Sequence, residues 1–213
     1  MTGWISIAIS FLALAVSGVT AWLTMFRKGE LRMTKPTVIF FGPDGGSVAG
    51  RKRQLKVFLR TLLFSTSRRG QTIESLHVNL QRGESKQNFS IWVYGDDRLT
   101  RGSGLFVPRE GIACNHHFLL PDDGSDFNLL AGQYTLRVYA KKVDASSATE
   151  LAVVRLQIAE AEAMELKQEG AGIYFDWGPD QQAYQPHIEI KPPDPLDQIL
   201  RHLPPLTKKA ARG

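Results

Sequence analysis

The chain has one cysteine in 213 residues, Cys114, so no disulfide can form within it. Small secreted β domains often depend on disulfides, and a single thiol therefore favours a reducing compartment. The chain also lacks a strong excess of positive or negative charge, since it has 26 Lys and Arg and 21 Asp and Glu. With 43% hydrophobic residues, the chain is not disordered throughout. Its length suits one domain plus smaller extras.

Motifs that carry chemistry are missing as well. The sequence has no Gly-x-Ser-x-Gly, no phosphate-binding glycine loop before a helix and no calcium-loop spacing. The segment 114–117, Cys-Asn-His-His, is the one metal-like group. On a strand Cys114 and His116 would share a face while His117 points away, but a zinc site needs three or four ligands. We therefore expect no catalytic residue, no cofactor and no bound metal.

Signals for nucleic acid or sugar are weak. Short basic groups occur at 51–53, 68–69 and 208–209, without a recognition helix or an aromatic RNA-binding pattern. Nucleic acid is therefore not an expected partner, whereas anionic lipid beside an anchored domain would attract such groups by about 1 kcal/mol per residue. Aromatic residues expected on strand surfaces could stack on a sugar, but isolated surface aromatics are common. They are Trp92, Tyr94 and Tyr139.

A long uncharged run opens the chain. Residues 3–26 carry no charge over 24 positions, and as a helix they would extend about 36 Å, enough to cross a hydrocarbon core of about 30 Å. Trp4 and Trp22 would lie about 27 Å apart, as interfacial aromatic residues do. A cleaved signal peptide is the alternative, with 13–15 (Ala-Leu-Ala) as its site, but no basic residue precedes the run and the run is too long. Residues 1–26 are therefore predicted to be a transmembrane anchor.

Basic residues follow this run and none precedes it. The segment 27–36 is a basic juxtamembrane linker in which only Glu30 opposes the positive charge. The positive-inside rule then places the N-terminus outside and the C-terminal domain in the cytoplasm. The residues predicted at the membrane interface are Trp4, Trp22, Arg27 and Lys28.

Small and hydroxyl residues recur along one side of the predicted anchor. At 100° per residue they fall within an arc of about 80°. Such residues let helices approach closely and hydrogen-bond across an interface, which predicts packing against another helix. The alternative is that the hydroxyls bond to carbonyls of their own helix and face lipid. The predicted packing residues are Ser6, Ser10, Ala13, Ser17, Thr20 and Thr24, and Thr2 precedes them in the same series.

Residues 37–160 read as short strands between turn signals. Leu76, Val78 and Leu80 alternate with polar residues, which indicates an antiparallel sheet with one buried face. Segments 133–141 and 151–158 alternate in the same way. Seven such strands predict an all-β, two-sheet antiparallel sandwich. The predicted strands are 37–42, 55–66, 73–82, 89–94, 112–120, 133–141 and 151–158.

The segment 130–138, Leu-Ala-Gly-Gln-Tyr-Thr-Leu-Arg-Val, resembles the late-strand signature of immunoglobulin-like and fibronectin III-like domains. The resemblance implies that Tyr134 folds back to bond a loop backbone, as a structural tyrosine corner. This sequence departs from the antibody pattern because Leu136 stands where those domains carry a cysteine and the third strand lacks a tryptophan. The resemblance concerns fold alone, since this superfold hosts many functions.

Residues 161–213 are expected to be a C-terminal, Pro-rich tail. Its aromatic segment 173–180 is expected to be an edge strand packed on the sandwich rather than a recognition motif. Further on, 195–203 follows the pattern of a short helix, with Asp194 as its cap. Ten residues do not hold a helix alone in water, so this segment is predicted to dock on a partner. The docking residues are Leu196, Ile199, Leu200 and Leu203.

Together these features favour a single-pass, membrane-tethered interaction or scaffold module, an accessory subunit of a membrane complex without catalysis of its own. Its expected partners are the lipid bilayer and either another membrane protein or a second copy. Two alternatives remain at this point. One is an extracytoplasmic ligand-binding sandwich, and the other is a metal-dependent enzyme.

Overall fold

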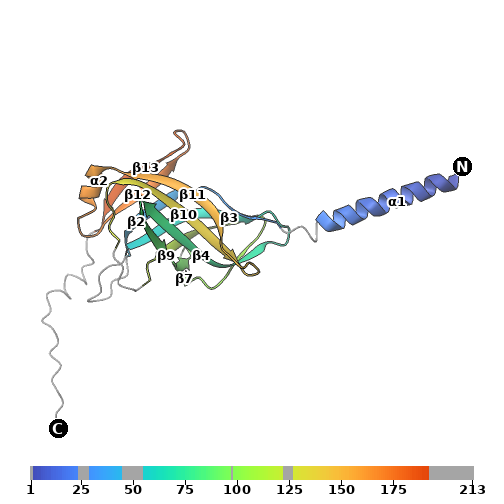
Figure 1. Cartoon of the computed structure of the whole chain (residues 1–213), viewed down its shortest axis with the longest axis horizontal. Helices are drawn as coiled ribbons and strands as arrows, with labels where there is room; N and C mark the ends of the chain where they lie inside the picture. The colour runs from blue at the N-terminus through green and yellow to red at the C-terminus, as the bar shows by residue number, and fades with distance from the viewer. Residues whose placement is uncertain (1, 24–28, 45–54, 97, 122–126, 192–213) are drawn as a thin grey trace, which may run out of the picture.

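The computed structural model describes residues 2–23, 29–44, 55–96, 98–121 and 127–191. Helix α1, Thr2–Ala21, stands apart from a β-sandwich at one end of the molecule (Figure 1). Its side chains are exposed throughout the stretch for which burial is described. A helix in the core of a domain would be mostly buried, and α1 is not.

Two antiparallel sheets form the sandwich. Among the described residues, sheet A has eight strands in the order β13-β12-β2-β3-β9-β6-β7, with β1 also paired to β3. Its strands are β1 Leu31–Met33, β2 Val38–Pro43, β3 Leu55–Ser65, β6 Ile91–Tyr94, β7 Thr100–Arg101, β9 Ile112–Leu119, β12 Ala171–Gly178 and β13 Ala183–Ile190.

Sheet B has five strands within the same described ranges, in the order β11-β10-β4-β5, with β8 also paired to β4. They are β4 Gln71–Arg82, β5 Ser85–Phe89, β8 Leu105–Val107, β10 Gly132–Lys142 and β11 Thr149–Ile158. One hydrophobic core lies between the two sheets. The predicted two-sheet antiparallel sandwich is therefore confirmed.

The alternation read from the sequence marks the buried faces correctly. Leu76, Val78 and Leu80 of β4 are buried, and alternate residues of β10 from Tyr134 to Ala140 are buried with them. Apolar side chains on one side of each strand remove their surface from water only if that side faces the second sheet. The hydrophobic effect thus sets the face that each strand turns inward.

The predicted strand 89–94 divides into two. Strand β5 ends at Phe89 in sheet B, and β6 begins at Ile91 in sheet A. Phe89 and Trp92 are both buried although they are three positions apart, so the alternation breaks where the chain crosses between sheets. Trp92, expected at the surface, is only 3% exposed, which corrects that expectation.

Sheet A also continues beyond the expected domain boundary at residue 160. The short helix α2, Glu160–Glu165, leads from β11 of sheet B to β12 of sheet A. Strand β12 lies between β2 and β13, an interior position rather than the expected edge. Ile173 and Phe175 of β12 are fully buried in the core, and this burial accounts for its interior position.

Several predicted segments lie outside the described residues. They are the docking helix 195–203 with Leu196, Ile199, Leu200 and Leu203, and the anchor-end residues Thr24, Arg27 and Lys28.

Candidate functional site at the junction of helix and sandwich

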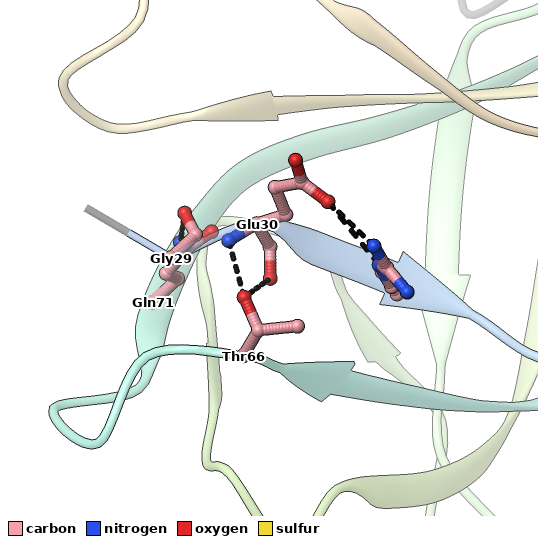
Figure 2. A network of polar contacts seen from close by, with 5 residues as sticks. Gly29, Glu30, Thr66 and Gln71 are labelled. Atoms are coloured by element: carbon pink, nitrogen blue, oxygen red, sulfur yellow. Dashed lines mark hydrogen bonds and ion pairs between the residues drawn. The ribbon is translucent and has the colours of Figure 1, made fainter. Parts of the chain in front are cut away.

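After the apolar helix, the chain is attached to the sandwich by hydrogen bonds between Glu30 and Thr66. The Glu30 backbone N–H donates to Thr66 Oγ1 over 2.7 Å (Figure 2). The Thr66 backbone N–H donates to Glu30 O over 2.9 Å. Strand β1 then pairs with the end of β3, with Leu31 opposite Ser65. The residues after the helix are therefore part of sheet A from Leu31 onward.

Gly29 and Gln71 add a second attachment. Gln71 Nε2 donates to the Gly29 carbonyl oxygen (Figure 2). A Cβ atom on Gly29 would lie 2.2 Å from the backbone nitrogen of Ser67, so only glycine fits this approach. We call Gly29, Glu30, Thr66 and Gln71 the junction. The Arg32–Glu30 ion pair at 2.9 Å is well exposed and adds little stability.

The junction keeps the sandwich close to the helix. Five residues, 24–28, separate Leu23 from Gly29, and a chain of that length extends at most about 22 Å. The junction residues are 36 or more positions apart across the contacts Glu30–Thr66 and Gly29–Gln71. Sequence patterns did not reveal them, because a threonine just after β3 and a glutamine at the start of β4 carry no periodic signal.

Helix α1 itself is long and apolar enough over Gly3–Ala21 to cross a membrane, although a signal sequence near an N-terminus has the same length and composition. Trp4 and Trp22 are both exposed. Ser10 Oγ donates to Ser6 O over 2.9 Å, and Thr20 Oγ1 donates to Val16 O over 2.7 Å. In both bonds a hydroxyl donates to a carbonyl of its own helix, as in the lipid-facing alternative given above. Packing of this side of α1 against another helix stays a prediction.

Two residues of segment 114–117, Cys114 and His116, form a buried polar cluster with Trp92. Cys114 and His116 share the inward face of β9, with Cys114 Sγ 3.4 Å from His116 Nε2. Trp92 Nε1 lies 3.2 Å from His116 Nδ1. An indole N–H is only a donor, so His116 Nδ1 accepts and the neutral ring carries its proton on Nε2. That proton points to the Cys114 sulfur.

This arrangement does not activate the thiol. A histidine that donates to sulfur cannot take the thiol proton, and a doubly protonated ring would set its Nδ1–H against the Trp92 N–H. Burial, with a smaller contribution from His117, lowers the pKa of His116 to about 4. Burial and nearby Asp96 raise the pKa of Cys114 to about 11. The group acts as core packing with satisfied polar atoms.

A metal site does not form around it either. Across the described part of the chain, no group of three or more His, Cys, Asp or Glu side chains could hold a metal ion. His117 points to the opposite face of sheet A, where its ring lies 5.0 Å from that of Phe58.

Tyr134 makes a loop contact of the kind that the immunoglobulin-like resemblance implies. Its hydroxyl donates to the Leu130 carbonyl oxygen over 2.7 Å and accepts from the Leu130 N–H over 2.9 Å. The ring is buried in the core, and burial raises the pKa of the phenol. Tyr134 thus ties the start of β10 to the loop before it.

Aromatic rings also line up across the outer face of sheet A. Directly paired positions on five neighbouring strands hold a ring each, and we call this set the outer aromatic row. Three of the four neighbouring pairs pack ring on ring, with centroids 4.5 Å apart for Phe40–Tyr174, 5.2 Å for Tyr174–His187 and 5.0 Å for Phe58–His117. Because the rings cover each other, the row is not a bare apolar surface. Its members are His187, Tyr174, Phe40, Phe58 and His117.

Comparison with known proteins adds little. No protein-family model matches the chain, and no curated protein sequence matches it. Among solved structures, the CooA pilin subunit from enterotoxigenic Escherichia coli aligns with 58% of this chain and 99% of its own, at 12% identity and a TM-score of 0.27. A TM-score that low carries no argument about fold or function. The chain is therefore a β-sandwich with an N-terminal apolar helix, and its role must be argued from its own residues.

Proposed function

We propose that this protein is a membrane-tethered interaction module: α1 crosses the bilayer and the junction holds an immunoglobulin-like sandwich close to the surface. The observation that carries the proposal is the junction itself. With α1 in the bilayer, the attachment of Gly29 and Glu30 to the sandwich leaves only residues 24–28 between the described end of the helical segment and the domain. The Glu30–Thr66 and Gly29–Gln71 bonds begin six residues after the last described residue of the helical segment.

The proposed orientation has the N-terminus outside and the sandwich in the cytoplasm. Its support is the positive charge of 27–36 and the single, buried Cys114 thiol. A fluorescent protein fused to the C-terminus of the full chain should be bright, and an alkaline phosphatase fusion inactive. The protein should also resist alkaline carbonate extraction at its full, uncleaved mass. An active phosphatase fusion, or a mass lacking the first 20 or so residues, would overturn the orientation or the anchor.

A second candidate is a ligand-binding sandwich outside the cell. It is favoured by the position of α1, because an apolar helix near an N-terminus is also what a signal sequence requires. The same two fusions separate the candidates, since external display predicts active phosphatase and a dim fluorescent protein.

The partner contact proposed for this module uses the tail helix 195–203, supported by its apolar spacing of three and four residues. Replacing Ile199 and Leu200 by Asp should abolish capture of a partner from solubilised membranes, because each buried side chain contributes about 1.5–3 kcal/mol. The unfolding midpoint of the sandwich should not move. A marked loss of stability would place the segment in the sandwich core and end the docking hypothesis.

A further inference from the structure

Two large apolar side chains remain exposed at the junction end of sheet B. Phe106 of β8 and Val143, just after β10, are each 56% exposed, although the core takes up most large apolar residues of the sandwich. Both lie beside Thr72 of β4. Phe106 is its paired residue, and the Val143 N–H donates to Thr72 O over 3.1 Å. Since Thr72 follows Gln71, both side chains belong to the end that the junction attaches to α1.

The exposure of Phe106 follows from the strand rather than from a loose loop. Leu105 and Val107, its neighbours in β8, are buried, so alternation turns Phe106 outward. The ring packs directly on the backbone of Gly70, where a Cβ atom would lie 2.5 Å from Phe106 Cζ and where φ is +69°. The sandwich therefore presents this ring in a defined position.

Basic residues lie in two turns at the same end of the sandwich. Arg68 and Arg69 are exposed in the β3–β4 turn, and Arg109 is exposed in the turn that the Ser65–Pro108 backbone bond holds against the end of β3. Among the described residues of this end, four exposed basic side chains stand beside three exposed acidic ones. The basic ones are Arg32, Arg68, Arg69 and Arg109, and the acidic ones are Glu30, Glu110 and Asp144.

The topology separates this cluster from the other basic groups. Strand β3 runs for eleven residues from Leu55 to Ser65, about 33 Å. Leu55 lies at the end of β3 opposite the junction, and the basic group 51–53 precedes it in the sequence, outside the described residues. Of the two groups that flank β3, only Arg68 and Arg69 are therefore kept near the helix by the short segment 24–28.

We propose that the junction end of the sandwich contacts the headgroup layer of the membrane that α1 crosses. This proposal depends on the membrane tether proposed above. Phe106 and Val143 would enter the interface, where aromatic side chains are favoured, and the arginines would contact lipid phosphates. A segment limited to about 22 Å keeps this end at the surface without a further binding partner. The sandwich then stands upright on the bilayer instead of moving freely around its tether.

The test places a polarity-sensitive fluorophore on Val143→Cys in the full chain, in vesicles of phosphatidylcholine and phosphatidylserine. Leu130→Cys is the matched control, because Leu130 is 45% exposed and precedes β10 at the opposite end of that strand. The buried thiol of Cys114 stays unreactive at neutral pH. We expect blue-shifted emission at V143C and severalfold stronger quenching by lipid spin-labelled at the headgroup than at L130C. Equal, water-like emission at both positions would overturn the proposal.

Two further variants test the contacts. Phe106→Asp changes an exposed side chain, so its unfolding midpoint should be unchanged. This variant should remove the blue shift at V143C. Arg68→Glu with Arg69→Glu should reduce the quenching in vesicles with phosphatidylserine but not in pure phosphatidylcholine. A blue shift that survives F106D would assign the shielding of Val143 to something other than lipid. Extraction of the chain by carbonate would instead overturn the membrane tether on which the proposal rests.

Discussion

A buried imidazole can carry protons or serve as a polar group of the core, and its neighbours decide which. His116 is 1% exposed, and its Nδ1 faces the indole N–H of Trp92. A charged ring would place two donors against each other in a site that water does not reach. The neutral form is therefore the folded form near pH 7, and Cys114 gains no base.

The pH dependence of stability should report this neutral state. The pKa of His116 is lowered to about 4 in the folded chain from 6.5, so the unfolded chain binds the proton first as pH falls. Stability is then lost as pH drops below the unfolded value, by about 2 kcal/mol between pH 7 and 5. Asn at position 116 keeps an acceptor for Trp92 without titrating, so His116→Asn should lose about 2 kcal/mol less over this range. Urea unfolding of both full chains in detergent at the two pH values measures the difference, and parallel losses would contradict it.

At the scale of elements, the residues after the junction form strand β1, which pairs with β3. Thr66 is the central residue because its hydroxyl accepts the Glu30 N–H while its backbone N–H donates to the Glu30 carbonyl. Short strands at sheet edges open easily, and β1 has only three residues. The side-chain contacts of Thr66 and Gln71 hold the start of β1 on the sandwich, while bonds between Thr34 and Leu62 hold the residue that follows it.

Replacing Thr66 by Val should loosen the junction without unfolding the sandwich. The variant keeps the branched shape and loses the hydroxyl, at a cost of about 0.5–1.5 kcal/mol. Hydrogen exchange of the Glu30 amide should accelerate by roughly tenfold, while the core strands β4 and β10 keep their protection. Thr149→Val, at an exposed threonine of β11, is the matched control and should leave the exchange at Glu30 as it is. Unchanged exchange in T66V would show that the Thr66 hydroxyl does not hold the junction.

For the whole molecule, the β12–β13 hairpin completes the core. Strand β12 pairs with both β2 and β13, and Phe175 packs against Phe41 with ring centroids 5.5 Å apart. The hairpin also covers sheet A beside β2, which would otherwise form its edge. The folding unit thus reaches Ile190.

Truncations at two positions test this extent. A chain that ends after Lys191 should unfold at the same midpoint as the full chain. A chain that ends after Glu169 loses Ile173 and Phe175 from the core, and each contributes about 1.5–3 kcal/mol of burial, so we expect it not to fold. Circular dichroism and thermal unfolding in detergent measure both. A cooperative, native-like transition in the shorter chain would instead place the boundary near residue 160, as the sequence suggested.

Local patterns in the sequence determined the apolar helix, the class of the fold and the inward face of most strands. Charge-free length and two-residue alternation are properties of neighbouring residues, and Leu76, Val78 and Leu80 show them directly. The tertiary structure decided what depends on residues far apart. It assigned β5 and β6 to different sheets, buried Trp92 against His116, drew β12 into sheet A and joined Gly29 to Gln71. Pairing between distant strands sets these contacts, and alternation tells which face is buried but not which strand will lie beside it.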